Sequence, residues 1–287
     1  MERLLILGPG RVGLSLGQAL VDAEGVESVT YMGRHPDPPD HPLFGHPTIR
    51  YHYGIRGPEE GTTAVFLTVP DRVLEAMAEV LAGRGRPPPG TPALHCSGAL
   101  GAEPLAALHG MGYRVGTLHP LQALADPLTG AGRLRGATFA LSGEREALAA
   151  ARRIVQLLGG RSLTIPTQRR PQYHAAAVMA SNYLVVLLRQ ATRLLREVGA
   201  SPEEAEQAIV ALARGTLENS ADLGLERALT GPVVRGDLDV IDLHLRTLDS
   251  RDRELYLLLA RRTLDEAAAG LPDETVGAMR QLLERSS

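Results

Sequence analysis

The sequence predicts an α/β fold in which a doubly wound, mostly parallel sheet is followed by an all-helical C-terminal domain. Up to about residue 166, short apolar runs alternate with helical patterns, which is typical of the βαβ units that build a parallel sheet. From Pro171 onward, no segment has the pattern of a strand. We therefore expect two domains, residues 1–166 and residues 167–287.

The first strand and the turn after it carry the main indication of function. Leu4–Leu7 is a continuous apolar run, and Gly8, Gly10 and Gly13 follow at G-x-G-x-x-G spacing before a helical pattern begins. In a Rossmann unit, these glycines allow the tight turn, the approach of a pyrophosphate and close helix packing. The alternative is an ordinary βα turn with incidental glycines. The cofactor-binding residues expected in this turn are Gly8, Gly10, Arg11, Val12 and Gly13.

The end of the second strand, residues 28–32, bears on the choice of cofactor. NAD-binding units place an acidic residue there to hold the ribose 2′-hydroxyl, but this strand runs into Gly33 and Arg34, with no acid until Asp37. Arginine at that corner suits a 2′-phosphate, so we expect NADP rather than NAD. The alternative is a solvated loop arginine. The proline-rich residues 35–47 are expected to lack regular structure.

The remaining elements follow from the same patterns. Further strands are expected at residues 63–69, 93–96, 113–118, 137–141 and 162–165. Helices should cover residues 72–82, the region around Leu105, and residues 144–158. The helical domain should contain residues 172–198, a helix capped at Ser201, and residues 237–248, 250–269 and 272–285. Because helix 172–198 is apolar nearly all round its middle, we expect it to be buried between neighbours.

Catalytic-type side chains follow three consecutive strands of the expected sheet. Asp71 comes after one strand, Ser97 after the next and His119 after the third. Parallel sheets bind ligands at the carboxyl ends of their strands, so we expect Ser97 and His119 to be catalytic. The structural alternatives are a helix N-cap for Asp71, a turn for Ser97 and a satisfied core histidine for His119. The residues expected to contact the cofactor at these ends are Val69, Pro70, Asp71 and Ser97.

Two further groups of polar residues lie in the expected helical domain. His174, Ser181 and Asn182 share one face of an otherwise apolar helix, where polar groups are costly to bury without partners. They either face a substrate cleft or form an internal hydrogen-bond network; we favour the cleft. In the loop TGPVVRGD, Arg235 is placed to clamp a carboxylate, while Asp237 has the alternative role of an N-cap.

Composition excludes several classes of protein. Of the 287 residues, 44% are hydrophobic and the net charge is −3, so no general basic field favours nucleic acid. No apolar run is long enough for a membrane span and no signal peptide precedes the first strand, so a cytoplasmic location is expected. The single cysteine, Cys96, argues against a disulfide framework, and no metal site is expected. All 30 basic residues are arginine, so acid–base chemistry falls to histidine, carboxylate or tyrosine.

Four separated motifs carry a family resemblance: LHCSGAL (94–100), GTLHPLQAL (116–124), YHAAAVMASNYL (173–184) and TGPVVRGD (230–237). Together they resemble a family of predicted oxidoreductases that joins a Rossmann-like NAD(P) domain to a helical "domain of unknown function 2520". The resemblance implies a helical domain like those of 6-phosphogluconate dehydrogenase and pyrroline-5-carboxylate reductase relatives, which commonly form dimers through that part. Ser97 and His119-Pro120 are also similar to a serine and a His-Pro that serve the substrate hydroxyl in prephenate dehydrogenases.

The leading hypothesis is an NADP-dependent oxidoreductase that moves a hydride between nicotinamide and a small carbonyl, imine or alcohol. His119, with an ordinary pKa near 6.5, would exchange the proton and Ser97 would orient it. His174 and Asn182 would line the substrate side, and Arg235 would hold an acidic group. The competing hypothesis is a non-catalytic NAD(P)-binding redox sensor or dimeric scaffold. A homodimer through the helical half is expected in either case.

Overall fold

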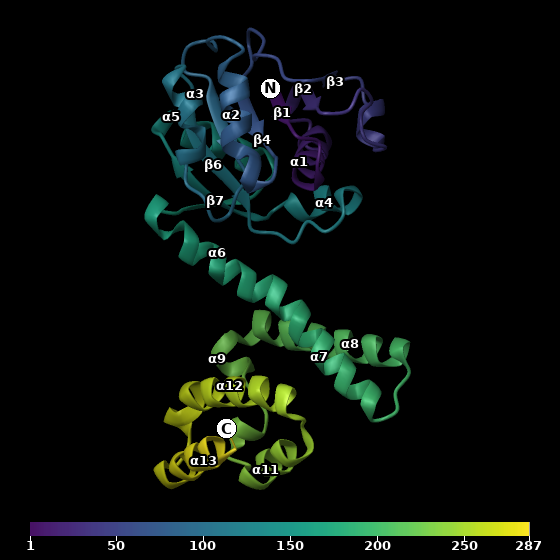
Figure 1. Cartoon of the computed structure of the whole chain (residues 1–287), viewed down its shortest axis with the longest axis vertical. Helices are drawn as coiled ribbons and strands as arrows, with labels where there is room; N and C mark the ends of the chain where they lie inside the picture. Colours follow the sequence, from purple (N-terminus) through teal and green to yellow (C-terminus); the bar gives the residue numbers. More distant parts are fainter. Residues whose placement is uncertain (287) are drawn as a thin grey trace. The chain divides into compact units, whose positions relative to one another are not determined.

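The computed structural model describes residues 1–286. The chain divides into two compact units, Met1–Asn182 (unit 1) and Tyr183–Ser287 (unit 2) (Figure 1). The division falls later in the chain than the expected domain boundary at residue 166. The reason is that helix α6 (Arg170–Val178) is joined to the sheet of unit 1 by side chains of its first turns. Unit 1 therefore holds the sheet and the start of the long helix.

Unit 1 is built on one eight-stranded sheet with the strand order β3-β2-β1-β4-β5-β6-β7-β8. Neighbouring strands are parallel except β6 and β7, which confirms the doubly wound, mostly parallel fold class. Because β2 and β4 flank β1, the chain reverses its winding direction there, and ligands bind beyond the carboxyl end of such a switch point. The strands are β1 Glu2–Leu7, β2 Val26–Gly33, β3 Ile49–Tyr53, β4 Ala64–Leu67, β5 Pro92–His95, β6 Arg114–Pro120, β7 Thr138–Gly143 and β8 Arg161–Thr164.

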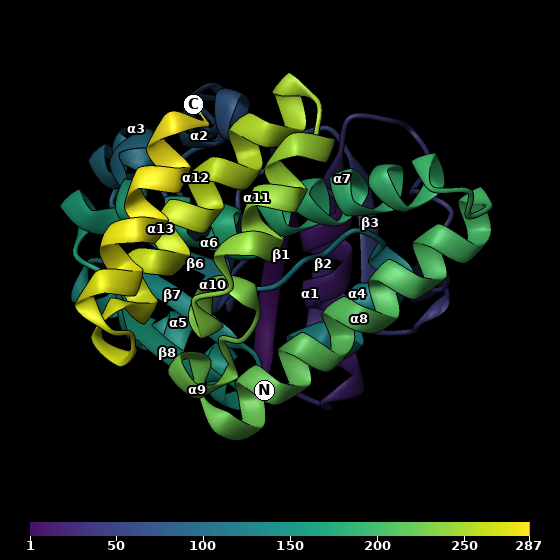
Figure 2. The same ribbon diagram turned by 90° about the horizontal axis from the view of Figure 1, so that it is seen from below.

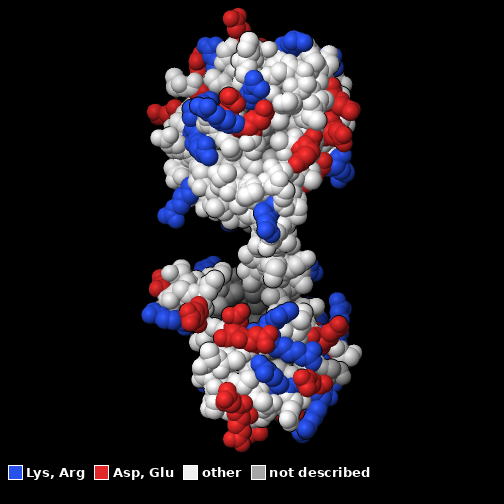
Figure 3. Space-filling view, turned by 90° about the vertical axis from the view of Figure 1, so that its left-hand side faces the viewer, with Lys and Arg blue, Asp and Glu red and all other residues white. Residues whose placement is uncertain are grey.

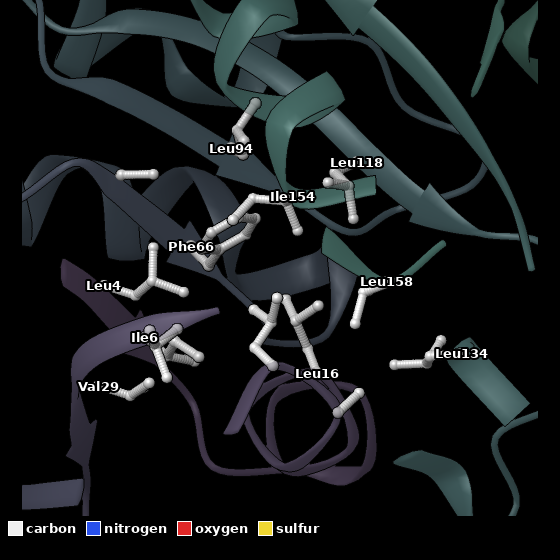
Figure 4. Close-up of a cluster of buried hydrophobic side chains, with 14 of the residues drawn as sticks. Leu4, Ile6, Leu16, Val29, Phe66, Leu94, Leu118, Leu134, Ile154 and Leu158 are labelled. Atoms are coloured by element: carbon white, nitrogen blue, oxygen red, sulfur yellow. The ribbon is translucent and has the colours of Figure 1, made fainter. Parts of the chain in front are cut away.

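Both faces of the sheet are covered by helices. Helices α1 (Arg11–Asp22), α4 (Pro127–Leu134) and α5 (Arg145–Leu157) contribute to one core, and α2 (Leu74–Ala82) and α3 (Ala106–Gly110) to the other. Alternate residues of β1 enter the two cores: Leu4 and Ile6 lie in the first, among the side chains of Figure 4, and Leu5 and Leu7 in the second. Burial on both faces explains why these strands read as continuous apolar runs.

Three elements of unit 1 were not expected from the sequence. Strand β3 is half polar and sits at the sheet edge, and a short 3-10 helix, Pro42–Gly45, begins where the His41 ring accepts the Leu43 N–H. The third is α4, whose glycines suggested a loop. At Gly130 a Cβ atom would collide with the Ser15 hydroxyl of α1, so glycine here allows close helix packing instead of breaking a helix.

The expected helix 172–198 is interrupted. It consists of α6, a π-helical turn at Met179–Tyr183 and α7 (Leu184–Glu197), and the boundary between the units falls inside the π-helical turn. The expectation that this helix is buried between neighbouring helices is also wrong within a single copy of the chain. Val185 and Val186 are 56% and 52% exposed, respectively, and no residue of α7 is fully buried.

Unit 2 is helical throughout its described residues. Helix α8 (Pro202–Leu223) begins at the expected cap, Ser201, which forms a reciprocal capping box with Glu204. The helix packs against α7. Helices α12 and α13 lie side by side (Figure 2). They form a small core with the helices before them. The remaining helices are α9 Leu225–Ala228, α10 Pro232–Arg235, α11 Leu238–Thr247, α12 Ser250–Ala267 and α13 Asp273–Arg285.

Charges of both signs are interspersed over the face of the chain in Figure 3, where arginine side chains alternate with acidic ones. Several pairs are in contact, for example Arg3 with Glu27 and Arg246 with Asp242. Among the described residues, no helix is both long enough and apolar enough to cross a membrane.

Candidate functional site

The glycine turn has the conformation that its spacing predicts. Gly8 has φ +99°, and a Cβ there would lie 2.8 Å from Cγ1 of Val69, so this position requires glycine. The Thr68 hydroxyl donates to the Gly8 carbonyl at 2.6 Å and fixes the turn against β4. A Cβ at Gly13 would lie 2.5 Å from the same carbonyl oxygen, so glycine allows α1 to approach the strand.

The N-terminus of α1 has the features of an anion site. Gly10 is its N-cap, no side chain caps it, and no acidic residue lies in the first turn. Gly10 is exposed, and a Cβ there would come no closer than 4.0 Å to the Thr68 carbonyl oxygen, so a ligand can reach the backbone. Unpaired N–H groups and the helix dipole favour a pyrophosphate at this place. The turn therefore fits the dinucleotide that the sequence predicts.

A cavity of about 960 Å³ opens beside this turn, at the carboxyl ends of β1, β2 and β4. Of the residues expected to bind the cofactor, Gly8, Gly10, Arg34, Val69 and Pro70 line it. The other five expected residues are not in its lining: Arg11, Val12, Gly13, Asp71 and Ser97. Arg11 and Asp71 are next to a lining residue in sequence, whereas Val12 and Gly13 follow Gly10 by two and three residues.

Opposite charges enter the same cavity at the end of β2. Arg34 is exposed, and its Nε donates to Nε2 of His35 at 3.2 Å; Asp37 also lines the cavity. The Tyr51 hydroxyl donates to the His35 carbonyl at 2.6 Å and so holds this corner in place. An arginine is suited to a 2′-phosphate and an aspartate to a 2′-hydroxyl, and this cavity contains one of each.

Ser97 and Asp71 join the ends of two strands. The Ser97 hydroxyl donates to Oδ2 of Asp71 at 2.7 Å and accepts the Leu100 N–H at 3.2 Å. Asp71 begins a 3-10 helix, Asp71–Val73, without capping it through a side-chain hydrogen bond. The Ser97 hydroxyl thus holds the loop that follows β5 through two hydrogen bonds and is already occupied in this structure.

His95, the last residue of β5, holds the same loop from inside. Its Nδ1 accepts the Ser97 N–H at 3.1 Å, so the ring proton is on Nε2, which donates to the carbonyl of Gly101. Burial lowers the pKa of His95, because the charged ring would be poorly solvated. This neutral histidine fixes the backbone on either side of Gly98.

His119 and His174 converge on Gly98. A Cβ at Gly98 would collide with Nδ1 of His174 and would lie 2.8 Å from Nε2 of His119, so the close approach of the two rings requires glycine here. The ring centroids of the two histidines are 5.9 Å apart, and the rings are nearly perpendicular at 87°. Nδ1 of His174 is buried and has no hydrogen-bond partner. The structure therefore brings together two of the predicted catalytic residues beside the loop of a third, Ser97.

The pKa of His119 differs from the ordinary value expected from its sequence. Burial, assisted by the nearby charge of Arg170 and by His174 and His95, lowers this pKa to about 4. The ring is therefore neutral near pH 7. Its Nδ1 is 2.8 Å from the hydroxyl of Tyr173, with the two rings edge to face.

Arg170 and Tyr173 are parts of this site that the sequence did not single out. Arg170 is fully buried; its two amino groups donate to the Ser97 carbonyl at 2.5 Å and to the Ser142 hydroxyl at 3.2 Å. Its guanidinium carbon lies 5.9 Å from the centre of the Tyr173 ring. The only signal in the sequence was position: both residues flank the start of the helix that carries His174.

Two predicted site residues do not join this cluster. Asn182 is exposed in the π-helical turn, about 12 Å along the helix from His174 at 1.5 Å per residue. Arg235 belongs to unit 2, where its Nε donates to Asp237 at 2.8 Å. Asp237 precedes α11 but makes no side-chain cap. Within residues 1–286, no group of three or more His, Cys, Asp or Glu side chains is arranged to hold a metal ion.

The strand order, the switch point and the glycine turn together define a Rossmann-type fold, which is followed in the chain by a helical region. Residues 137–263 match the family model described as "Domain of unknown function (DUF2520)", which confirms the family resemblance stated from the sequence motifs. The matched region begins at the start of β7, so it includes the last part of the sheet as well as helices α6 to α11. No curated protein has a sequence that matches this chain.

Solved structures share the fold over nearly the whole chain. A protein from Thermotoga maritima, TM1727, has a TM-score of 0.73 at 24% identity, covering 93% of this chain and 99% of its own. A Bacteroides fragilis protein assigned provisionally as an NADP oxidoreductase has a TM-score of 0.70 at 20% identity, covering 91% and 97%. Pyrroline carboxylate reductase from Plasmodium falciparum, with NADP bound, has a TM-score of 0.60 at 12% identity, covering 100% and 98%. At these identities the likeness establishes the fold.

Proposed function

We propose that this protein is an NADP-dependent oxidoreductase that transfers a hydride between nicotinamide and a small carbonyl, imine or alcohol. One observation carries the proposal. The cavity at the glycine turn extends to Pro70, and the next residue, Asp71, is hydrogen-bonded to Ser97. Ser97 in turn precedes Gly98, which both histidines approach. A dinucleotide-type cavity and a pair of imidazoles thus occupy the same edge of one sheet.

The binding roles follow from the geometry of the cavity. The uncapped N-terminus of α1 would hold the pyrophosphate, with Arg11 and Val12 in its first turn and Gly10 open to the ligand. Arg34 would hold the 2′-phosphate of NADP. The NADP-bound reductase of the same fold supports this choice of cofactor. Asp37, in the same lining, is the feature that would instead favour NAD.

When bound, the nicotinamide gives or accepts the hydride. The role of His119 is to exchange a proton with the substrate oxygen or nitrogen, because its Nε2 lies next to Gly98 in the loop that follows β5. Ser97 acts through its backbone loop, since its hydroxyl is engaged by Asp71 and Leu100. His174, with an unpartnered Nδ1, is positioned to bind substrate from the other side. Substrate contacts by Asn182 and Arg235 stay predictions.

The proposal is tested by titrating NADPH and NADH and then measuring NADPH oxidation with a panel of small ketones, aldehydes and cyclic imines. The chain has no tryptophan, so NADPH fluorescence can be followed without interference from indole. We expect tighter binding of NADPH and measurable oxidation with at least one class of acceptor. If NADPH does not bind, the proposal is wrong. If NADPH binds but its nicotinamide does not affect His119 or His174, the result would favour the competing hypothesis of a non-catalytic redox sensor.

We also propose that the protein is a homodimer through the hairpin of α7 and α8. Large apolar side chains are exposed along both helices, among them Val186 of α7 and Leu212 and Leu217 of α8. Only Ala205 is buried in α8, although the helix has 22 residues. An exposed apolar surface of this kind marks an association site more often than a solvent face.

A further inference from the structure

The first two turns of α6 bring a phenol and a cation to the imidazole of His119. The hydroxyl of Tyr173 is 2.8 Å from Nδ1, on the opposite side of the ring from Nε2, which faces Gly98. Arg170, one turn earlier on the same helix, is fully buried and lies 5.9 Å from the centre of the Tyr173 ring. Tyr173 itself is only partly buried. Tyr173, His119 and Gly98 therefore follow one another in a row, and the partly buried phenol is at the end away from Gly98.

The direction of the hydrogen bond follows from acidity. A phenol is a stronger acid than a neutral imidazole N–H, and an imidazole nitrogen is a stronger base than a phenol oxygen. The Tyr173 hydroxyl is therefore the donor and Nδ1 the acceptor. Since the hydrogen bond at one ring nitrogen decides which nitrogen is protonated, the proton of neutral His119 is on Nε2. It faces the place where the proposed function puts the substrate.

The charge of Arg170 adds to burial in keeping His119 neutral. Its guanidinium donates to the Ser97 carbonyl and the Ser142 hydroxyl, which are neutral. The carboxylates of Glu103 and Asp71 interact with it electrostatically and favour its charged form. The groups that face His119 are Arg170 itself, Tyr173, His174 and His95, and none of them is a carboxylate. A second positive charge on His119 is thus unfavourable, whereas a negative charge on Tyr173 is stabilised.

We propose that Tyr173 and His119 form a two-member proton relay and that Arg170 is the positioning residue whose charge helps to keep His119 neutral. This inference rests on the proposed function. When hydride adds to the substrate carbon and forms a C–H bond, the π electron pair of the C=O bond moves to oxygen. The Nε2–H bond then breaks and a substrate O–H bond forms. At the same time Nδ1 takes the proton of Tyr173, so His119 only changes tautomer and never becomes an imidazolate. The phenolate beside Arg170 then regains a proton from water, and oxidation of an alcohol runs the same steps in reverse.

The protonated state of each member at rest agrees with this order of transfer. Burial raises the pKa of Tyr173, with Arg170 partly opposing it, so the hydroxyl keeps its proton until Nδ1 needs it. The pKa of His119, at about 4, keeps a lone pair available on Nδ1. A relay of this kind delivers a proton without a cationic histidine, which the neighbouring arginine would oppose.

The relay is tested first on the free protein by ring-nitrogen NMR of His119, so no cofactor or substrate is needed. We expect protonated Nε2 and hydrogen-bonded Nδ1 at pH 7 in the wild type. Tyr173→Phe should move the Nδ1 signal to the position of a free nitrogen. Tyr183→Phe, the same change at an exposed tyrosine, should leave it in place. A wild-type proton on Nδ1, or no response to Tyr173→Phe, overturns the relay while leaving the proposed function intact.

Arg170 is tested by the pH titration of the same ring. Arg170→Gln removes the charge and should move the midpoint of His119 upward toward 6.5, whereas Arg170→Lys keeps the charge and should hold the midpoint low. Equal midpoints in the two variants contradict the role of the charge.

Once a substrate is found, Tyr173→Phe should lower turnover by roughly 100-fold. The wild-type rate should then depend on two protons in mixed light and heavy water, and the variant rate on one.

Discussion

The two units of this chain bury their apolar residues to different degrees. In unit 1, every residue of β4 and the helical faces on both sides of the sheet are enclosed within the same chain. In unit 2, a small core of α10 to α13 is enclosed, but the hairpin of α7 and α8 leaves Leu212 69% exposed and Leu217 57% exposed. Unit 1 also contains the cavity and both converging histidines. We infer that unit 1 carries the chemistry and that unit 2 carries association.

The largest effect should come from the histidine that unit 1 holds at Gly98. His119→Asn should lower turnover by roughly 100- to 10,000-fold, because the proton exchange at Nε2 is lost. NADPH affinity should stay nearly unchanged, since His119 does not line the cavity. Steady-state kinetics and NADPH titration check both halves. Full turnover in a folded variant would assign His119 to the scaffold and make His174 the candidate.

A charge on the hairpin should act on association alone. Leu212→Glu should weaken the dimer by about 2–4 kcal/mol, the range seen when a central apolar contact is lost and a charge is buried. Sedimentation at micromolar concentration measures it. Leu128→Glu in α4 is the matched control, because Leu128 is 62% exposed in unit 1. A wild-type monomer at that concentration would refute the association role of unit 2.

Cofactor choice should depend on two residues of unit 1 with opposite charge. Arg34→Ala should weaken NADPH binding by about 1–3 kcal/mol relative to NADH, because it removes a charged hydrogen bond to the 2′-phosphate. Asp37→Ala should change the ratio in the other direction by a smaller amount. Titration of both cofactors against the two variants measures this. Equal affinity of the wild type for NADPH and NADH would contradict the role of Arg34.

A further effect of His119 concerns the stability of unit 1 against pH. The pKa of His119 is lowered in the folded chain to about 4, so between the ordinary value of 6.5 and that value only the unfolded chain binds the proton. Its contribution is therefore present above pH 6.5 and is lost as pH falls toward 4, at about 1.4 kcal/mol per pH unit. His95 contributes in the same direction. His119→Asn should have a shallower loss of stability with acid than the wild type, as urea unfolding at each pH would reveal.

The fold and the cavity were largely predictable because they depend on local patterns. Buried strands read as apolar runs, and the glycine spacing placed Gly8 and Gly10 correctly beside the cavity. Helix α4 was missed because glycine signals both loops and close packing, and only the neighbouring Ser15 distinguishes the two. Strand β3 was missed because an edge strand has too few buried residues to show alternation.

The histidine cluster was predictable only in part. The ends of β5 and β6 are adjacent in any such sheet, so Ser97 and His119 could be placed near each other. The lowered pKa of His119 could not be predicted from the sequence, since it results from burial and from Arg170, which is distant in sequence. The use of the Ser97 hydroxyl by Asp71 is likewise a three-dimensional fact. Asn182 does not join the histidine cluster, because the π-helical turn breaks the periodicity from which a face shared with His174 was inferred.

The central claim is that one ligand extends from the cavity at the glycine turn to the histidines at Gly98. It is tested most directly by histidine-ring NMR during titration with NADP and, separately, with a 2′-phosphorylated ADP that lacks the nicotinamide. Both ligands should bind, and both should bind less tightly to Arg34→Ala. Only NADP should move the ring signals of His119 and His174. If NADP binds without moving them, or moves them no more than the truncated ligand does, the cavity and the histidines are separate sites and the account is wrong.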